Sequence, residues 1–246
     1  MSLAERFATA VAAEATADDR DDGHLLPARL ARAAARLLEV DGAGLSVMVG
    51  PIGRLPLGAS SPEAEHAERL QFTAGAGPCL LAHDSGQPVF AVDEDLRHRW
   101  PAFADLLLSA TPFHGVVSLP LRWALAGVGA MDLFFRDPEE VSRLDVFDAL
   151  AVGALVVSTL GDASVWSTWS EAEGPAWLRS PPALRRIVVW TAVGRTSTAL
   201  DVDSTHALAL LRACAYAAGR SVDAVAADLV SGRLVPEEFV GRPGEH

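Results

Sequence analysis

The sequence predicts an α/β (α+β) domain with a mostly antiparallel sheet, followed by an all-α module of three helices. In the first 160 residues, short apolar stretches of strand length are mixed with amphipathic helical stretches and rarely follow a strict β-α-β order. The end of the chain shows only helical patterns. Charge divides in the same way, because residues 181–246 hold seven arginines and seven acidic residues, whereas residues 1–180 carry the whole net charge of −12.

Composition limits the classes of protein to consider. A chain of 246 residues, half of them hydrophobic, can form one large or two small domains with a real core. We expect a cytoplasmic protein without a membrane span, because the N-terminus lacks the features of a secretion signal and no apolar run approaches roughly 20 residues. All 20 basic residues are arginine, and the acidic N-terminal part should repel nucleic acid, whereas the neutral C-terminal part need not.

The predicted elements begin with a short helix and a flexible, solvated break in residues 1–24. A helix from Pro27 then places Leu30, Ala34, Leu37 and Leu38 on one face, and the stretch DGAG ends it. The stretches LSVMV and LPLGASS read as strands on either side of a turn, GPIG.

Helices and strands are expected to alternate through the rest of the first domain, which spans residues 25–160. Helices are predicted in SPEAEHAERLQF, CLLAHDSG and PAFADLLLSAT, and strands in QPVFAV, VVSLPLRWAL and GVGAMDLFF, the last two joined by a turn near Ala126 and Gly127. A long helix, SRLDVFDALAVGALVVSTL, ends the domain, with one side made of Leu144, Phe147, Leu150, Ala151 and Ala154.

Residues 161–182 form a linker rich in Trp, Pro and Gly. Gly161, Gly174 and the Pro181-Pro182 pair should prevent one continuous helix, and the linker offers no heptads for a coiled coil. We therefore expect its tryptophans to pack against a neighbouring domain, and any homodimer to form through the domain helices. The tryptophans concerned are Trp166, Trp169 and Trp177.

Three helices are predicted in residues 183–235. The first runs from about Ala183 to Leu200, the second from Asp203 or Ser204 to Gly219, and the third from Ser221 to Gly232. Residues 236–246 read as a flexible tail.

Two segments resemble known families. Residues 71–135 resemble an actinobacterial GAF domain through QFTAGAGPCLLAHDSGQPV, RWPAFADLLLSATPFHGVVSLPL and GVGAMDLF. Residues 184–234 resemble an ANTAR domain, and the matching positions are Ala192, Gly194, Ala207, Leu211, Arg212, Ala215, Tyr216, Val225, Ala226, Leu229 and Val230. The resemblance implies a GAF sensor with a small-molecule ligand, followed by a module that binds hairpin loops in nascent messenger RNA and prevents transcription termination.

Arg212, Tyr216 and Arg220 are the candidate RNA-binding residues of the second helix, where their spacing predicts one stripe. Arginine can bind phosphate with its planar fork, and tyrosine can stack on an unpaired base. Arg185, Arg186 and Arg195 on the first helix could add phosphate contacts. The same residues could instead cover apolar surface with their stems.

Other candidate sites are weaker. Cys79 and His83 are spaced i, i+4 on a predicted helix, and His114 is a third candidate, but the set lacks the ligand spacing of a zinc site. The run Asp93-Glu94-Asp95 suits a helix N-terminus. Because the sequence also lacks nucleophile, phosphate-loop and zinc-hydrolase motifs, we expect no metal, no cofactor, no catalytic residues and no enzyme.

Two hypotheses about function, from different classes of protein, remain open, and a third is weaker. The first is an RNA-binding antiterminator controlled by an N-terminal sensor. The second is a ligand- or partner-binding signalling protein whose helical module serves assembly. A DNA-binding helix-turn-helix regulator is the third reading, although the second helix holds few residues that read base edges.

Overall fold

The computed structural model describes residues 1–15, 23–49, 53–123, 127–166 and 175–240. A five-stranded sheet in the order β2-β1-β5-β4-β3 forms the centre of the N-terminal domain, and every pair of neighbouring strands is antiparallel. The strands are β1 (Gly42–Val49), β2 (Gly53–Ala59), β3 (Val89–Val92), β4 (Gly115–Trp123) and β5 (Gly127–Phe135). The predicted antiparallel sheet is therefore confirmed.

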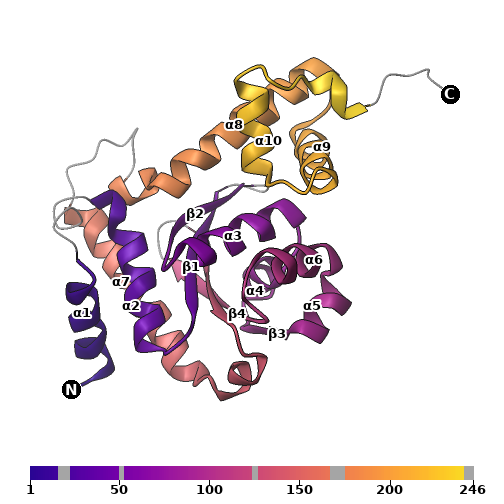
Figure 1. Ribbon diagram of the computed structural model, residues 1–246. Helices are drawn as coiled ribbons and strands as arrows, with labels where there is room; N and C mark the ends of the chain where they lie inside the picture. The colour runs from indigo at the N-terminus through magenta and orange to yellow at the C-terminus, as the bar shows by residue number, and fades with distance from the viewer. Residues whose placement is uncertain (16–22, 50–52, 124–126, 167–174, 241–246) are drawn as a thin grey trace.

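Helices cover both faces of this sheet (Figure 1). One face packs against α2 (Leu26–Leu37) and α7 (Val146–Trp166), and α1 (Leu3–Ala13) packs on these two helices. The other face carries α3 (Pro62–Ala74), α4 (Pro78–Ser85), α5 (Asp93–Arg99) and α6 (Pro101–Ala110). The helix α1 belongs to the packed domain, because Phe7 is buried in the first core; only residues 16–22 of the break predicted there lie outside the described residues.

Side chains along each strand alternate between the two faces of the pleated sheet, and the two faces hold different kinds of side chain. On β1, Leu45 and Val47 enter the apolar core with α2 and α7, whereas Ser46 faces the other side. On β5, Leu133 enters the same apolar core, whereas Asp132 faces the side of α3. The sheet thus has one apolar face and one that holds buried polar groups.

The long helix α7 differs from its prediction in two ways. It continues through Gly161 to Trp166, because a single glycine in a helix costs only about 1 kcal/mol. Its buried side is formed by Ala149, Val152, Val156 and Leu160, whereas the side predicted from the sequence is open, with Phe147 80% exposed. Among the described helices, α7 is the one long and apolar enough to cross a membrane, yet these four residues pack it against the sheet domain.

The segment after α7 returns to the N-terminal domain through Trp177. This side chain lies in a short 3-10 helix, Ala176–Arg179, is buried in the apolar core, and donates from Nε1 to Leu160 O at 3.2 Å. The side chains of Trp166 and Trp169, and the turn residue Ala126, lie outside the described residues.

Three helices with a core of their own follow, and Figure 1 shows them beside β2 and α3. They are α8 (Pro181–Leu200), α9 (Ser204–Ala217) and α10 (Val222–Val230). The side chains of Asp203 and Ser221 cap α9 and α10 by accepting from backbone N–H groups. Gly219 ends the α9 turn with φ +61°, a conformation that glycine adopts without strain.

Candidate functional site

Arg54 on β2 is the centre of a buried polar network between the sheet and α3. Its Nη2 donates to Asp132 Oδ2 at 3.0 Å and to the Glu68 carboxylate, and its Nε donates to Ser46 Oγ at 3.1 Å. Asp132 also accepts from Gln71 Nε2 at 2.9 Å. All five residues are buried, so this network is costly to form and depends on complete pairing.

Glu68 is the least satisfied member of the network. Its Oε1 is buried and lacks a hydrogen-bond partner among the described residues, although Oε2 accepts from Arg54. Desolvation by burial raises the pKa of Glu68 well above its ordinary value, and the nearby Arg54 only partly opposes this. Burial therefore favours the neutral acid form of Glu68.

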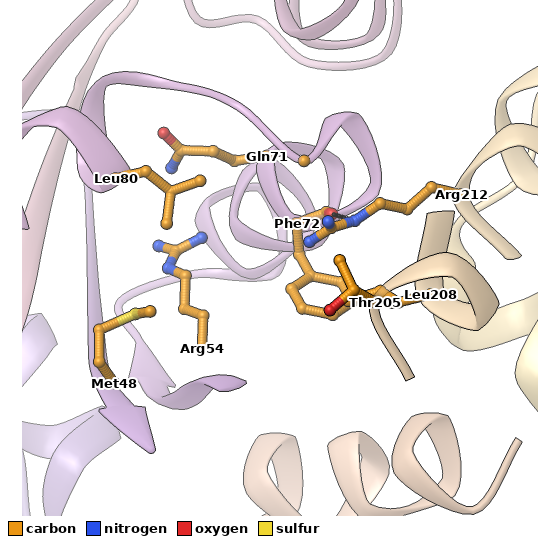
Figure 2. A pocket seen from close by; sticks show the side chains of 9 residues that line it. Met48, Arg54, Gln71, Phe72, Leu80, Thr205, Leu208 and Arg212 are labelled. Carbon is orange, nitrogen blue, oxygen red and sulfur yellow. Dashed lines mark hydrogen bonds between the residues drawn. The ribbon is translucent and has the colours of Figure 1, made fainter. Parts of the chain in front are cut away.

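A cavity of about 200 Å³ opens beside this network, at the contact between the N-terminal domain and α9 (Figure 2). Three residues of α9 line it: Thr205, Leu208 and Arg212, which lie on one face of the helix by their spacing. The N-terminal domain supplies the rest of the lining, which is Met48, Arg54, Gln71, Phe72, Gly75 and Leu80. We call this space the interface cavity.

Phe72, near the end of α3, connects the two parts of the protein. Its ring is buried in the core of the C-terminal module and makes an edge-on contact with Trp190, with the ring centroids 6.2 Å apart. The guanidinium carbons of Arg186 and Arg212 lie 3.4 and 4.9 Å from its ring centroid. One aromatic side chain of the N-terminal domain is thus a member of the helical core.

Polar contacts reinforce this docking. Arg212 Nε donates to Phe72 O at 3.0 Å, and Val222 N, at the start of α10, donates to Thr73 Oγ1 at 3.1 Å. Both acceptors, the Phe72 carbonyl and the Thr73 hydroxyl, lie in the last turn of α3. The docked arrangement therefore satisfies backbone groups of both parts.

Arg186 is a buried cation with incomplete pairing. Its side chain is 1% exposed, and its ion-pair partner is Asp223 at 3.7 Å. In the part of the chain that the structure describes, its Nε and Nη1 have no hydrogen-bond partner. Burial lowers the pKa of Arg186 to about 10, so the group remains charged at neutral pH. This residue was expected to contact phosphate, but the docked structure encloses it.

The other candidate RNA-binding residues are also engaged within the chain. Arg185 pairs with Glu65 of α3, and Tyr216 Oη donates to Asp105 Oδ2 of α6 at 3.1 Å. Arg195 Nη1 donates to Val230 O at 2.6 Å at the end of α10. Arg212 and Tyr216 therefore form a stripe that contacts the N-terminal domain.

Arg220 does not belong to that stripe, which corrects the prediction from spacing. The helix α9 ends at Ala217, and the chain turns at Gly219 before Arg220. Arg220 Nη2 instead pairs with Asp228 Oδ2 of α10 at 2.6 Å. The glycine that was identified as the helix end also removes the next residue from the helical face.

The sequence analysis missed the residues of the buried network. Arg54 and Asp132 each interrupt a stretch of strand character, and a charged residue there is a signal that could have been used. Phe72 gave no such signal, because an aromatic residue near the end of an amphipathic helix is ordinary.

The metal candidates are separated in the structure. Cys79 is buried, and burial raises the pKa of its thiol well above the ordinary value. His83 bonds to Asp84 on the surface, and His114 bonds to Asp93 at the start of α5. Within the described ranges, His, Cys, Asp and Glu side chains form no group of three or more that could hold a metal ion.

Comparison with known proteins gives structural neighbours only. No known family matches the sequence. No curated protein matches it either.

The solved structures similar to this chain include GAF domains. The GAF domain of an Acinetobacter phosphoenolpyruvate-protein phosphotransferase has 13% identity, covers 69% of this chain and 100% of its own, and has a TM-score of 0.45. The corresponding Coxiella burnetii domain has 13% identity, coverages of 65% and 98%, and a TM-score of 0.41. SdiA in complex with octanoyl-rac-glycerol has 15% identity, coverages of 91% and 97%, and a TM-score of 0.43.

Proposed function

We propose that the chain is a cytoplasmic signalling protein whose GAF-like N-terminal domain senses a small molecule and thereby controls the C-terminal module. The shared lining of the interface cavity carries this proposal. An occupant would touch Phe72 of the N-terminal domain and Leu208 and Arg212 of α9 at once. A ligand that favours one docking geometry shifts the population toward it, which is the physical content of sensing.

A screen of small metabolites against the full chain tests this proposal. A ligand of the interface cavity should raise the melting temperature and change hydrogen exchange in residues 204–217, because α9 forms one wall. Leu208→Glu, which places a charge in the wall, should abolish both effects, whereas Phe147→Ser on the open side of α7 should preserve them. A ligand whose effects survive Leu208→Glu would refute the cavity as the sensing site.

We propose that the C-terminal module is ANTAR-like, that it binds hairpin RNA, and that the protein thereby acts in transcription antitermination. The resemblance of residues 184–234 and the exposed arginines of α8, Arg185 and Arg195, support this proposal. Arg212 and Tyr216 contact the N-terminal domain in the docked arrangement, so RNA binding by these residues requires release of the module.

Binding of hairpin RNAs to the wild type and to three variants tests this proposal. Phe72→Ala should bind RNA more tightly than the wild type, because it weakens docking, and adding Arg212→Ala should remove the gain. Arg143→Ala, at an exposed pair with Glu139, is the matched control. If the released protein binds no hairpin from a random RNA library, the RNA proposal fails.

Assembly is the alternative role of the helical module, and one observation favours it. The stripe of Arg212 and Tyr216 is used for contact with the N-terminal domain. For the homodimer we propose the open side of α7, where Phe147 is 80% and Leu150 36% exposed. Sedimentation of the wild type and of Phe147→Ser with Leu150→Ser should show a dimer that becomes a monomer.

A further inference from the structure

Arg212 presents unpaired donors at the interface cavity. Its Nε is used by Phe72 O at 3.0 Å, but its Nη1 and Nη2 have neither a hydrogen bond nor an ion pair among the described residues. The side chain is half-buried, and burial lowers its pKa. A guanidinium fork with two free donors in a partly enclosed space matches the two oxygens of a carboxylate.

The charges around the cavity also favour an anion. The positive groups are Arg54, which lines the cavity, Arg212, and Arg186, which lies over the Phe72 ring that forms part of the wall. The carboxylates that face them are Glu68, Asp132 and Asp223. Glu68 and Asp132 both pair with Arg54, and Asp223 lies 3.7 Å from Arg186. Arg212 is therefore the guanidinium group of these three that has no carboxylate partner among the described residues, and a ligand carboxylate would supply one.

The size and lining of the cavity limit the rest of the ligand. Its volume of about 200 Å³ is below the roughly 300–1,000 Å³ of cavities that hold drug-sized ligands. A nucleotide is too large for it. Met48, Phe72, Leu80 and Leu208 supply an apolar lining, so the body of the ligand should be compact and apolar. Figure 2 shows Arg212 beside Phe72 at one side of this space.

We infer that the interface cavity binds a small organic acid with a compact apolar body, and that Arg212 of the C-terminal module holds its carboxylate. The inference rests on the proposed sensing function and names the class of ligand. Because the charge contact comes from α9 and the apolar contacts come mainly from the N-terminal domain, the acid would strengthen docking of the module.

Matched sets of compounds test the inference by calorimetric titration of the full chain. The two sets are phenylacetate, phenylacetamide and 2-phenylethylamine, and 4-methylpentanoate with its amide and amine. Each acid should bind at least about tenfold more tightly than its amide, since a hydrogen bond to an ionised group is stronger than one between neutral groups. The amines should be the weakest. Phosphate monoesters of similar size are included as a second kind of anion.

Substitutions test whether Arg212 makes the contact that causes the preference for acid over amide. Arg212→Gln should lose the preference for acid over amide while it binds the amides as the wild type does, because the apolar walls remain. Arg212→Lys should retain part of the preference, and Arg143→Gln, an exposed arginine paired with Glu139, should retain all of it. Equal loss of acid and amide binding in Arg212→Gln would mean that Arg212 only shapes the cavity, and would overturn the assignment.

The outcomes also separate this inference from the proposed function. Tighter binding of an amide, an amine or a phosphate monoester than of the matching acid would overturn the carboxylate class and leave the sensing function standing. If none of the acids binds but the metabolite screen finds another ligand whose binding Leu208→Glu abolishes, the carboxylate class is also overturned and the sensing function stands. If neither the screen nor the matched sets yields a ligand, both proposals are refuted.

Discussion

The two faces of the central sheet differ in chemistry. Toward α2 and α7 the strands present apolar side chains such as Leu45, Val47 and Leu133, which form a continuous core. Toward α3 the alternate positions hold a second apolar cluster that includes Val116 and Phe134, and beside it Arg54 and Asp132, buried and linked by an ion pair. Residues adjacent in sequence therefore stabilise the domain by burying apolar area on one face and meet a desolvation penalty on the other.

This difference indicates that the buried ion-pair network on the α3 side stabilises the fold less than apolar residues in its place would. A buried ion-pair network can often be replaced by apolar residues without loss of stability, so its presence next to the interface cavity suggests a role in binding. The C-terminal module docks on the polar side, through Phe72 and a few hydrogen bonds. Docking of this kind can respond to a ligand more readily than the apolar core can.

The largest effect is expected at Asp132. Asp132→Ala should lower the free energy of unfolding by about 4 kcal/mol, because it removes the buried acceptor of Gln71 and Ser118 and one of the two carboxylates that pair with Arg54. Leu133→Ala, the neighbour on the apolar face, should cost about 3 kcal/mol through a cavity. Guanidinium unfolding followed by circular dichroism measures both.

A triple variant refines that comparison. Combining Arg54→Met and Glu68→Leu with Asp132→Leu should recover at least about 2 kcal/mol relative to Asp132→Ala, since no buried charge of the network remains. A triple variant as unstable as Asp132→Ala would mean that the network stabilises the fold by itself.

The next effect concerns docking. Phe72→Ala should weaken the contact between the two parts by about 3 kcal/mol, because the ring is part of the helical core. Hydrogen exchange in residues 204–217 should then become up to roughly a hundredfold faster, while β1 and β5 keep their protection. Phe90→Ala, at a 41% exposed position on β3, is the control and should change neither. Unchanged protection of α9 in Phe72→Ala would show that docking depends on other contacts.

A smaller effect should appear in the pH dependence of stability. The folded-state pKa of Glu68 lies above its unfolded value, so the folded state binds more protons in the window between the two. The contribution of Glu68 is therefore fully present below the unfolded pKa, about 4.5, and is lost as pH rises through the folded pKa. Glu68→Gln should remove this decline. A pH profile of unfolding identical in the two proteins would contradict the neutral state of Glu68.

The smallest effect is expected at Arg220. Arg220→Ala removes an ion pair with Asp228 on the surface of the module, away from the interface cavity. The melting temperature should change by less than about 2 °C, and ligand binding should not change. A large shift in either quantity would mean that Arg220 acts together with Arg212 and Tyr216, although it lies beyond the end of α9.

Much of the local structure could be predicted from the residues. Proline located the starts of α3 and α6, Gly86 located the end of α4, and Asp203, Ser221 and Gly219 marked the boundaries of α9 and α10. These signals are local, because a cap satisfies backbone groups within one turn. The wrong side of α7 shows the limit: the helix is apolar all around, so periodicity could not tell which side the sheet covers.

The sequence by itself determined the order of helices and strands, the division of charge, and the face shared by Arg212 and Tyr216, because each depends on neighbours within a few residues. Only the tertiary structure decided what that face contacts. Arg212 meets Phe72 across 140 residues of chain, and Arg54 meets Asp132 across 78. Such pairs form because burial requires a partner for each polar group, and the partner is supplied by whichever strand or helix the packing of the apolar core brings near.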